Sequence, residues 1–364
     1  MPVRLRGRVG DAMKPEDVRE TVVPIVVNRL WGQDLLFSDQ DLTMTVERFG
    51  ERYIEPCSSI IANMIDGEGC DLMRGAYNLA GTAGTLANNL SNYTAAKVAL
   101  AKTATPQVHS LMSSVVSPDD EASLLGFGPN YFNPAKTIGD QYMTGKMGQA
   151  VGLKFSMDQN IARQLIGLVN GTPVVNGANQ SGSTLLSSGW TATAGIQVLN
   201  EGDIISVVGM NGVNPVSWRD TGTLRTVVVT ANVLSASDGT ASIPIAPDIN
   251  YDTTSQFQTV VNAPPNGNGI KVYNTASTAF ANISGVSSAQ NMVFHRDAMT
   301  LVVVRLEKPG GMEWSEEVYN KEIGLSCRLI RGYDIRGNQK LVRVDVLGGW
   351  KLVRPEFLCR VASA

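Results

Sequence analysis

The sequence has 364 residues and 43% hydrophobic residues, which is typical of a soluble globular protein long enough for two compact units. Charged residues make up only 17% of the chain and glycine occurs 36 times, a composition that favours β-rich structure with many turns. The net charge of -3 argues against a chain built mainly to bind nucleic acid. No apolar run has membrane-spanning length, and the highly charged start of the chain does not form a signal-peptide pattern.

Residues 1–28 predict a charged β-hairpin. Apolar and basic residues alternate in MPVRLRGRV, a turn is expected near GDAMKPED, and VRETVVPIVVN forms the returning strand. An isolated hairpin is marginal in water, so this one must lie on its own domain or on a neighbouring subunit. The charged side chains that face one another along the ribbon are Arg4, Arg6, Arg8, Asp11, Lys14, Glu16 and Asp17.

A long helix is predicted after the extended LLFS segment, with Thr45 as its N-cap and Glu47 in its first turn. Apolar residues recur three or four positions apart, so one face of the helix is apolar. They are Val46, Phe49, Tyr53, Cys57, Ile60, Ile61 and Met64. Pro56 removes a backbone hydrogen bond and is expected to bend or split this helix.

Two shorter helices are predicted further along the chain. NYTAAKVALAK indicates a second, alanine-rich helix over about residues 92–102. SPDDEASLL begins a third, with Ser117 as N-cap and Pro118 at the first helical position. VHSLMSSVV, between them, is expected to be a buried strand.

The composition changes between Gly171 and about Gln290, where basic residues become rare and Gly, Asn, Ser and Thr dominate. The segments GIQVLNEGDIISVVGM, TLRTVVVTANVL and TASIPIA predict strands separated by turns such as NEGD and SDGT. This pattern indicates an inserted β-rich domain, either a small barrel or a sandwich. The later segments MTLVVVRLE, LSCRLIRGYD, KLVRVDVLGGWKLV and FLCRV are extended again, with a hairpin turn at Gly337 and Asn338. The chain is therefore predicted to be one α+β domain that carries a β-rich insertion.

No arrangement of residues suited to catalysis, metal binding or cofactor binding is found. His109 and His295 lie in apolar, strand-like contexts without nearby ligands and are interpreted as structural. GDQYMTGKM, from Gly139, has the wrong spacing for a phosphate-binding loop. The acidic pairs Asp119–Asp120 and Glu316–Glu317 suit a helix N-terminus or a solvated face better than acid–base catalysis.

The remaining cysteines and basic residues also have structural interpretations. Cys57, Cys70, Cys327 and Cys359 are far apart in the sequence, and we expect reduced, buried thiols. The C-terminal basic residues are interleaved with acidic and apolar ones, which favours a solvated or intersubunit face over a nucleic-acid stripe. They include Arg328, Arg331, Arg336, Lys340 and Arg343.

Several long segments resemble the major capsid proteins of tailed bacteriophages, and within them the P-22-type coat protein family. FSDQDLTMTVERFGERYIEPCSSIIANMID is similar to that family's entry into its spine helix, and NYFNP with YMTGKMG is similar to its passage from P-domain toward A-domain. GTPVVNGANQSGSTLLSSGWT and EGDIISVVGMNGVNPVSWRDTGTL resemble its insertion domain. NMVFHRDAMTLVVVRLEKPGG and VDVLGGWKLVRPEFLCRV resemble its returning strands.

The resemblance implies the Hong Kong 97-type fold. Its parts would be residues 1–38 as an E-loop-like hairpin, 39–78 as the spine helix, 79–170 as the P-domain and the start of the A-domain, 171–290 as the inserted domain, and 291–364 as the returning strands. Family members usually carry an N-terminal arm before the hairpin, whereas Met1 falls inside its first strand here. Either this coat protein lacks the arm or the numbered chain starts late within a longer product.

The implied function is a major capsid protein whose pentamers and hexamers close into an icosahedral shell around double-stranded DNA. The implied partners are other copies of the chain, a scaffolding protein, a portal protein, a decoration protein and DNA contacted non-specifically, without catalytic residues, cofactor or membrane. The shell would assemble in the host cytoplasm and remain in the virion. The seven charged hairpin residues then become candidates for a subunit interface, where charge pairs set register more than affinity.

Two alternatives remain open at this point. The first is a β-rich tail, decoration or carbohydrate-binding structural protein, which predicts ligand binding by residues 171–290 and no self-assembly. The second is a hydrolase, which would require His109 or His295.

Overall fold

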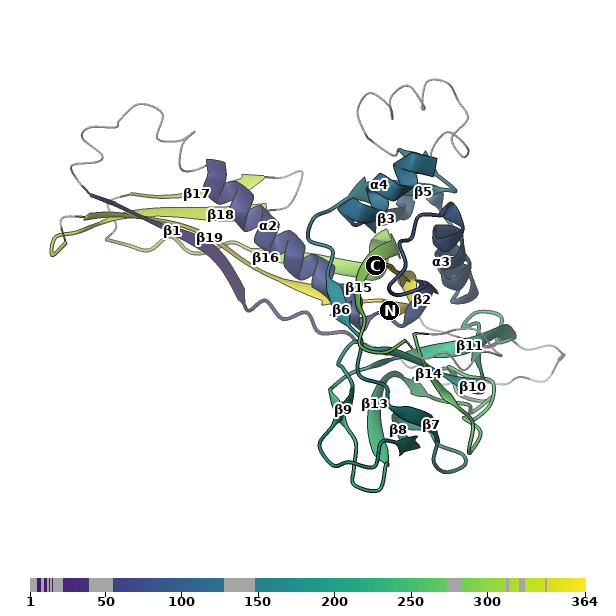
Figure 1. Cartoon of the computed structure of the whole chain (residues 1–364). Helices are drawn as coiled ribbons and strands as arrows, with labels where there is room; N and C mark the ends of the chain where they lie inside the picture. The colour runs from purple at the N-terminus through teal and green to yellow at the C-terminus, as the bar shows by residue number, and fades with distance from the viewer. Residues whose placement is uncertain are drawn as a thin grey trace. The chain divides into compact units, whose positions relative to one another are not determined.

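The computed structural model describes residues 5–7, 10, 11, 13, 15, 22–38, 55–127, 148–273, 283–311, 314–320, 325–337 and 339–364 (Figure 1). The chain divides into two compact units. Unit one contains Met1–Val23, Met73–Ala298 and Leu352–Ala364, and unit two contains Pro24–Leu72 and Met299–Lys351. Among the described residues, no helix is long and apolar enough to cross a membrane.

The described residues of unit two form a long sheet and one helix. The strand order is β1-β19-β18-β17, each neighbouring pair is antiparallel, and β16 also pairs with β19. The strands are β1 (Arg29–Ser38), β16 (Met299–Val304), β17 (Trp314–Asn320), β18 (Leu325–Asp334) and β19 (Gln339–Leu352). The β18–β19 hairpin confirms the predicted return of the chain between these strands, while Asn338 lies outside the described residues.

Helix α2 (Glu55–Asp71) packs against this sheet through Cys57, Ile61 and Ile65, each buried and four residues apart. Their partners on the strands are Trp31, Val344 and Val346, with Leu35 and Leu329 at the edge. Two residues of the predicted apolar face, Ile60 and Met64, are instead 45% and 42% exposed. The buried stripe is therefore narrower than the sequence pattern predicted. The predicted start at Thr45 lies outside the described residues, and Pro56 is the second residue of α2.

Strand β1 was not predicted. In the sequence, LLFS indicates only an extended approach to the helix, yet Arg29–Ser38 pairs along its full length with β19. Conversely, Val22–Asn28, which the hairpin prediction covers, has no regular secondary structure. Most of the rest of that hairpin lies outside the described residues.

Unit one contains a mixed sheet in the order β2-β20-β15-β3-β5-β4, with β6 paired to β15. Pairs β2–β20 and β3–β5 are parallel, and the other pairs are antiparallel. The strands are β2 (Asn78–Gly81), β3 (Met112–Val116), β4 (Gln149–Ala150), β5 (Leu153–Met157), β6 (Arg163–Leu165), β15 (Ser287–His295) and β20 (Leu358–Ala362).

Helices α3 (Leu90–Lys102) and α4 (Pro118–Phe127) confirm both short helix predictions. The Asn89 side chain caps α3 by accepting a hydrogen bond from the Ser91 N–H at 2.9 Å. Ser117 caps α4, because its Oγ accepts from the Asp120 N–H at 3.3 Å. The core between these helices and the sheet includes Tyr93, Leu100, Met112, Leu153 and Val293.

The β-rich part of unit one is an antiparallel sheet in the order β14-β10-β11-β13-β8-β7 (Figure 1). A bridge between Val174 of β7 and Gly269, just before β14, closes the sheet into a barrel-like form and confirms the predicted barrel or sandwich. The strands are β7 (Gly171–Val175), β8 (Gly182–Trp190), β10 (Ile204–Val213), β11 (Asp220–Val229), β13 (Ala241–Ile249) and β14 (Ile270–Val272). A two-stranded ribbon pairs β9 (Gln197–Leu199) with β12 (Val233–Leu234).

The core of the barrel-like sheet includes residues from outside residues 171–290. Leu79, Ile166 and Ala362 lie in one buried cluster with the barrel residues Ile205 and Val272. The two sheets of unit one therefore share apolar packing as well as covalent connections.

Gly171 and Gly189 mark a close approach of two barrel strands. Both have positive φ, +95° and +82°, and a Cβ on Gly189 would meet the carbonyl oxygen of Thr172. We expect Gly189→Ala to lower the free energy of unfolding by about 2 kcal/mol or more, because the left-handed region alone costs alanine roughly 1–2 kcal/mol. A denaturant titration measures the loss. Gly182→Ala is the matched control, since φ is +93° there and nothing lies within 4 Å of the added methyl. Equal losses in the two variants would contradict the close approach.

Candidate functional site

The charged residues proposed from the sequence as a subunit interface are only partly described. Arg6 and Asp11 belong to the described residues, whereas Arg4, Arg8, Lys14, Glu16 and Asp17 do not. The Arg6 guanidinium lies 4.1 Å from the ring centroid of Trp218 and donates hydrogen bonds to Ser255 O at 3.2 Å and Gln258 Oε1 at 2.7 Å. Arg6 thus contacts the barrel-like part of its own chain, and the interface role of the seven residues stays a prediction.

Neither histidine lies in a catalytic arrangement among the described residues. His109 is exposed on a 3₁₀ turn (His109–Leu111) rather than buried in a strand. His295 is buried, and its Nδ1 accepts a hydrogen bond from the Asp297 N–H at 3.2 Å while its ring packs against Phe357. The four cysteines are free thiols, and burial raises the pKa of the Cys359 thiol, which keeps it protonated.

In unit one, Arg360 on β20 is a charged residue whose side chain is fully buried. Its Nε donates to Ala76 O at 2.8 Å, and its Nη1 donates to Gly202 O at 2.7 Å and to the Tyr273 hydroxyl at 3.4 Å. Its Nη2 donates to the carbonyl oxygen of Arg74. One guanidinium therefore joins the segment before β2, the turn before β10 and the end of β14 to the last strand of the mixed sheet.

A buried carboxylate supports this arrangement from the barrel side. Asp203 Oδ2 accepts hydrogen bonds from the N–H groups of Gly167 and Asn200, at 2.9 and 2.8 Å, and Oδ1 accepts from Gln164 Nε2 at 3.1 Å. Burial raises the pKa of Asp203, while those hydrogen bonds and the charge of Arg360 act in the opposite direction. Burial likewise lowers the pKa of Arg360, and the charge of Asp203 opposes that change.

Sequence reasoning did not single out Arg360. The available signal was a lone arginine inside the apolar strand segment FLCRV, since a buried arginine must find partners for its charge and its five donors. Those partners come from segments about 90 to 290 residues away, which no local pattern reveals.

Asp120 forms a second buried polar cluster. Its Oδ1 accepts from the Ala87 N–H at 2.9 Å and from Ser363 Oγ at 2.6 Å, and its Oδ2 accepts from Ser117 Oγ at 2.8 Å and Asn291 Nδ2 at 2.5 Å. This confirms the interpretation of Asp120 as a structural carboxylate at a helix N-terminus. It fixes α4 against the middle of β15 and the end of β20.

In unit two, Asp345 is fully buried on β19 and is held by two arginines. Arg328 Nη2 lies 2.8 Å from its Oδ2, and Arg343 Nε lies 2.7 Å from its Oδ1. Gly32 is the β1 residue opposite Asp345, and a Cβ there would lie 2.8 Å from the carboxylate. Two of the C-terminal basic residues therefore serve the internal stability of this sheet.

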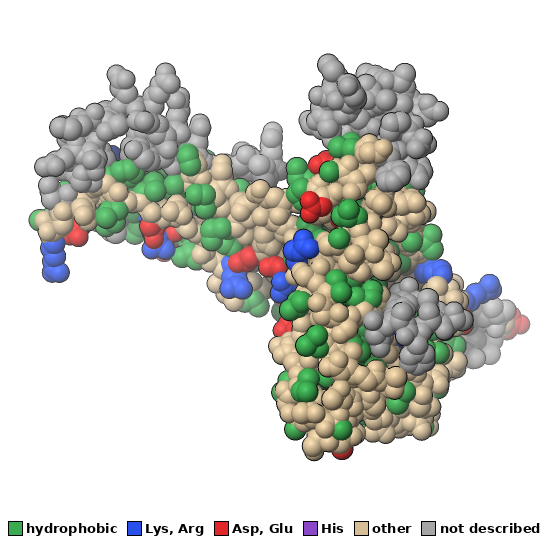
Figure 2. Space-filling model, in the orientation of Figure 1, with side chains coloured by type: hydrophobic (Ala, Val, Ile, Leu, Met, Phe, Trp, Pro, Cys, Tyr) green, Lys and Arg blue, Asp and Glu red, His purple; other side chains and the backbone are tan. Residues whose placement is uncertain are grey.

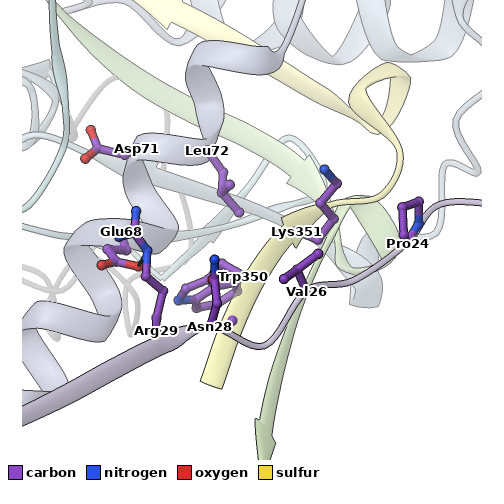
Figure 3. Close-up of a pocket in the computed structure, with 10 residues that line it drawn as sticks. Pro24, Val26, Asn28, Arg29, Glu68, Asp71, Leu72, Trp350 and Lys351 are labelled. Atoms are coloured by element: carbon purple, nitrogen blue, oxygen red, sulfur yellow. Dashed lines mark ion pairs between the residues drawn. The ribbon is translucent and has the colours of Figure 1, made fainter. Parts of the chain in front are cut away.

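A cavity of about 490 Å³ also lies within unit two (Figure 3). Arg29 pairs with Glu68 across it at 3.7 Å, and Trp350 forms a wall, fixed by a 2.8 Å hydrogen bond from its Nε1 to Ile65 O. Its described lining is Pro24, Val26, Asn28, Arg29, Glu68, Asp71, Leu72, Gly349, Trp350 and Lys351. These residues include no Ser, Cys or His, and two acidic side chains balance two basic ones. The cavity thus offers neither a nucleophile with a base nor a charge preference.

The molecular surface has the same mixed character on the face shown in Figure 2. Lys and Arg side chains do not gather into one stripe there, and hydrophobic side chains are scattered among polar ones. The described residues on this face form no continuous basic surface of the kind that nucleic-acid binding uses.

Comparison with known proteins gives one family match. Residues 147–359 match the family model described as "P22 coat protein - gene protein 5". No curated protein matches the chain.

Solved phage structures are similar at low identity. One from Mycobacterium phage Che8 is 12% identical with a TM-score of 0.47, and the match covers 99% of this chain and 82% of that one. The capsid of Ralstonia phage GP4 is 10% identical with a TM-score of 0.48, covering 99% of this chain and 81% of that one.

The buried arginine makes a direct prediction. Arg360→Met should lower the free energy of unfolding by about 3–5 kcal/mol, because it leaves Asp203 buried without its cation and three carbonyls without their donor. Chemical denaturation measures the loss. Arg354→Met is the matched control: Arg354 stacks on Phe357 at 4.9 Å at the start of the same segment, and its loss should be about 1 kcal/mol or less.

Should Arg360→Met fail to fold, Arg360→Lys provides the second test. It keeps the charge but not the planar donors, so its stability should lie clearly below that of the wild type. A wild-type stability in either variant would refute the structural role of Arg360.

Proposed function

This chain belongs to the P22 coat protein family, and on that premise we propose that its copies assemble as pentamers and hexamers into an icosahedral shell around double-stranded DNA. As a member of this family it is a phage major capsid (coat) protein that forms the shell, a structural component of the virion and not an enzyme. The observation that carries the proposal is the family match over residues 147–359, which spans the whole barrel-like sheet and more than half of the chain.

We further propose a Hong Kong 97-type division of the chain. Residues 39–78 would contain the spine helix, 171–290 the inserted domain, and 291–364 the returning strands. What supports this division is a single helix, α2, packed along a long antiparallel sheet, and a barrel-like sheet whose chain leaves and re-enters a mixed sheet. In the same division, residues 1–38 would form the E-loop-like hairpin, and residues 79–170 the P-domain and the start of the A-domain.

The exposed face of the unit-two sheet supports contacts between copies. Trp31 and Leu35 of β1 face α2, so Leu30 and Leu36, each one position away from one of them along the strand, face the other way. Leu36 lies opposite Leu341 on β19, and Leu30, Leu36 and Leu341 are 48%, 57% and 45% exposed. Large apolar side chains gathered on one face of a sheet indicate an interface, and obligate shell contacts bury on the order of 2,000 Å² or more.

Further partners belong to the same proposal. The seven charged residues near the N-terminus would pair across a subunit boundary, where each exposed pair contributes about 0–1 kcal/mol and mainly sets register. A scaffolding protein would direct assembly in the host cytoplasm, a portal would occupy one vertex, a decoration protein would bind the outside, and packaged DNA would be contacted non-specifically.

Electron cryo-microscopy of the full chain, co-expressed with the scaffolding protein of the same phage, tests the proposed assembly. We expect closed particles whose reconstruction shows five-fold and six-fold clusters of this subunit. Open sheets, tubes only, or a monomer under all assembly conditions would rule out the proposed icosahedral shell.

Deleting residues 1–17 tests the proposed interface. The deletion should leave a folded subunit by circular dichroism but abolish or misdirect assembly, because the charged residues would be absent at the boundary. Arg6→Ala removes the contact of Arg6 with Trp218 in the same chain, so its assembly shows how much of the effect of the deletion comes from that one residue. Normal particles from the deletion would exclude an interface role for this segment.

A further inference from the structure

A second cavity lies wholly within unit one, between α3, β2 and the β10–β11 hairpin. Its volume is about 260 Å³. Its described lining is Asn78, Leu79, Ala80, Gly81, Ala95, Val98, Ala99, Lys102, Thr103, Gly212, Val213, Thr221, Thr223, Leu224, Arg225 and Thr226. We call it the α3–β11 cleft. Its walls are made mostly of small apolar and hydroxyl side chains.

The charge of this cleft is one-sided. Lys102 and Arg225 are the charged side chains in its described lining, and none there is acidic. The Arg225 guanidinium lies 4.3 Å from the ring centroid of Tyr77, which orients it without neutralising it. Its Nε is buried and has no hydrogen-bond partner. Among the residues that the structure describes, no carboxylate forms an ion pair with either cation.

The C-terminal end of α3 does not neutralise these cations. A helix C-terminus carries partial negative charge on its unpaired carbonyls. Here the carbonyls of Ala99 and Ala101 accept the N–H groups of Thr103 and Ala104, at 3.2 and 3.1 Å. The carbonyl of Lys102 accepts from Asn214 Nδ2 at 3.0 Å. The carbonyl groups at the C-terminal end of α3 are thus largely hydrogen-bonded within the fold, so they do not cancel the positive charge of Lys102 and Arg225.

We propose that the α3–β11 cleft binds an oxyanion, a phosphate or a carboxylate, through Arg225 and Lys102. The planar guanidinium suits the two oxygens of such a group, and the Lys102 ammonium adds a second charge. A cavity of 260 Å³ holds a group of this size with a short apolar stem along Leu79, Val98 and Leu224, whereas duplex DNA does not fit it.

Two sources could provide this group, and one experiment separates them. The first is a free anion in solution. The second is the carboxylate of an acidic side chain from a neighbouring copy, because a coat protein meets other copies of itself throughout the shell. Both use the same two cations.

Isothermal titration of the unassembled full chain with inorganic phosphate, and separately with glutarate, tests the site at constant ionic strength. We expect saturable binding that Arg225→Gln weakens at least about tenfold and Lys102→Gln weakens several-fold. Lys154→Gln, an exposed cation on β5 outside the cleft, is the matched control and should bind as the wild type does. Arg225→Lys keeps the positive charge but not the planar guanidinium, so its binding should be weaker than that of the wild type and stronger than that of Arg225→Gln. This variant preserves the test if Arg225→Gln misfolds.

Repeating the titration with assembled shells identifies the source. Binding to shells as to free subunits assigns the site to a solution anion, and loss of binding in shells assigns it to a neighbour's carboxylate. The proposal is overturned if the wild-type subunit binds neither anion saturably. It is also overturned if the two cleft variants and the Lys154→Gln control bind equally well.

Discussion

A guanidinium removed completely from water has to find compensation inside the protein, and in unit one Arg360 imposes this constraint. Transferring a charge to the interior costs several kcal/mol unless hydrogen bonds and an opposite charge surround it. The carbonyls of Arg74, Ala76 and Gly202, the Tyr273 hydroxyl and the charge of Asp203 provide that surrounding. Because these groups come from distant parts of the sequence, satisfying Arg360 requires the end of the chain, the start of β2 and the barrel-like sheet to come together.

The apolar cluster that the two sheets of unit one share also holds them together, as the hydrogen bonds of Arg360 do. We call the contacts of Arg360 and this cluster together the joint between the two sheets. Leu79 and Ala362 on two strands of the mixed sheet pack with barrel residues, so the barrel-like sheet does not complete its core alone. An excised fragment of residues 171–290 would lack those contacts as well as Arg360. For a coat protein this joint has a clear use. An inserted sheet fixed to its parent sheet presents its outer surface in one orientation in every copy.

Much of this fold could be predicted from sequence because its signals are local. Ser117 followed by Pro118 predicted the start of α4, and turns such as SDGT separated the barrel strands correctly. Strand β1 was missed because its partner, β19, lies about 300 residues later, and because Gly32 and Asp34 interrupt its apolar pattern. A glycine is needed at position 32 because the Asp345 carboxylate leaves no room for a side chain, and Asp345 is far away in the sequence. The candidate interface residues were chosen from alternating charge, and the one whose contacts are described in detail, Arg6, lies on Trp218.

Native-state hydrogen exchange on the wild-type subunit tests the joint most directly. We predict that the slowest-exchanging amides of β10, in the barrel-like sheet, and of β20, in the mixed sheet, open with the same free energy and the same denaturant dependence. This result is expected because Arg360 and the shared core make the two sheets one cooperative unit. If the amides of β10 exchanged through a separate opening while those of β20 stayed protected, the barrel-like sheet would be an independent unit. That result would contradict the central role of Arg360.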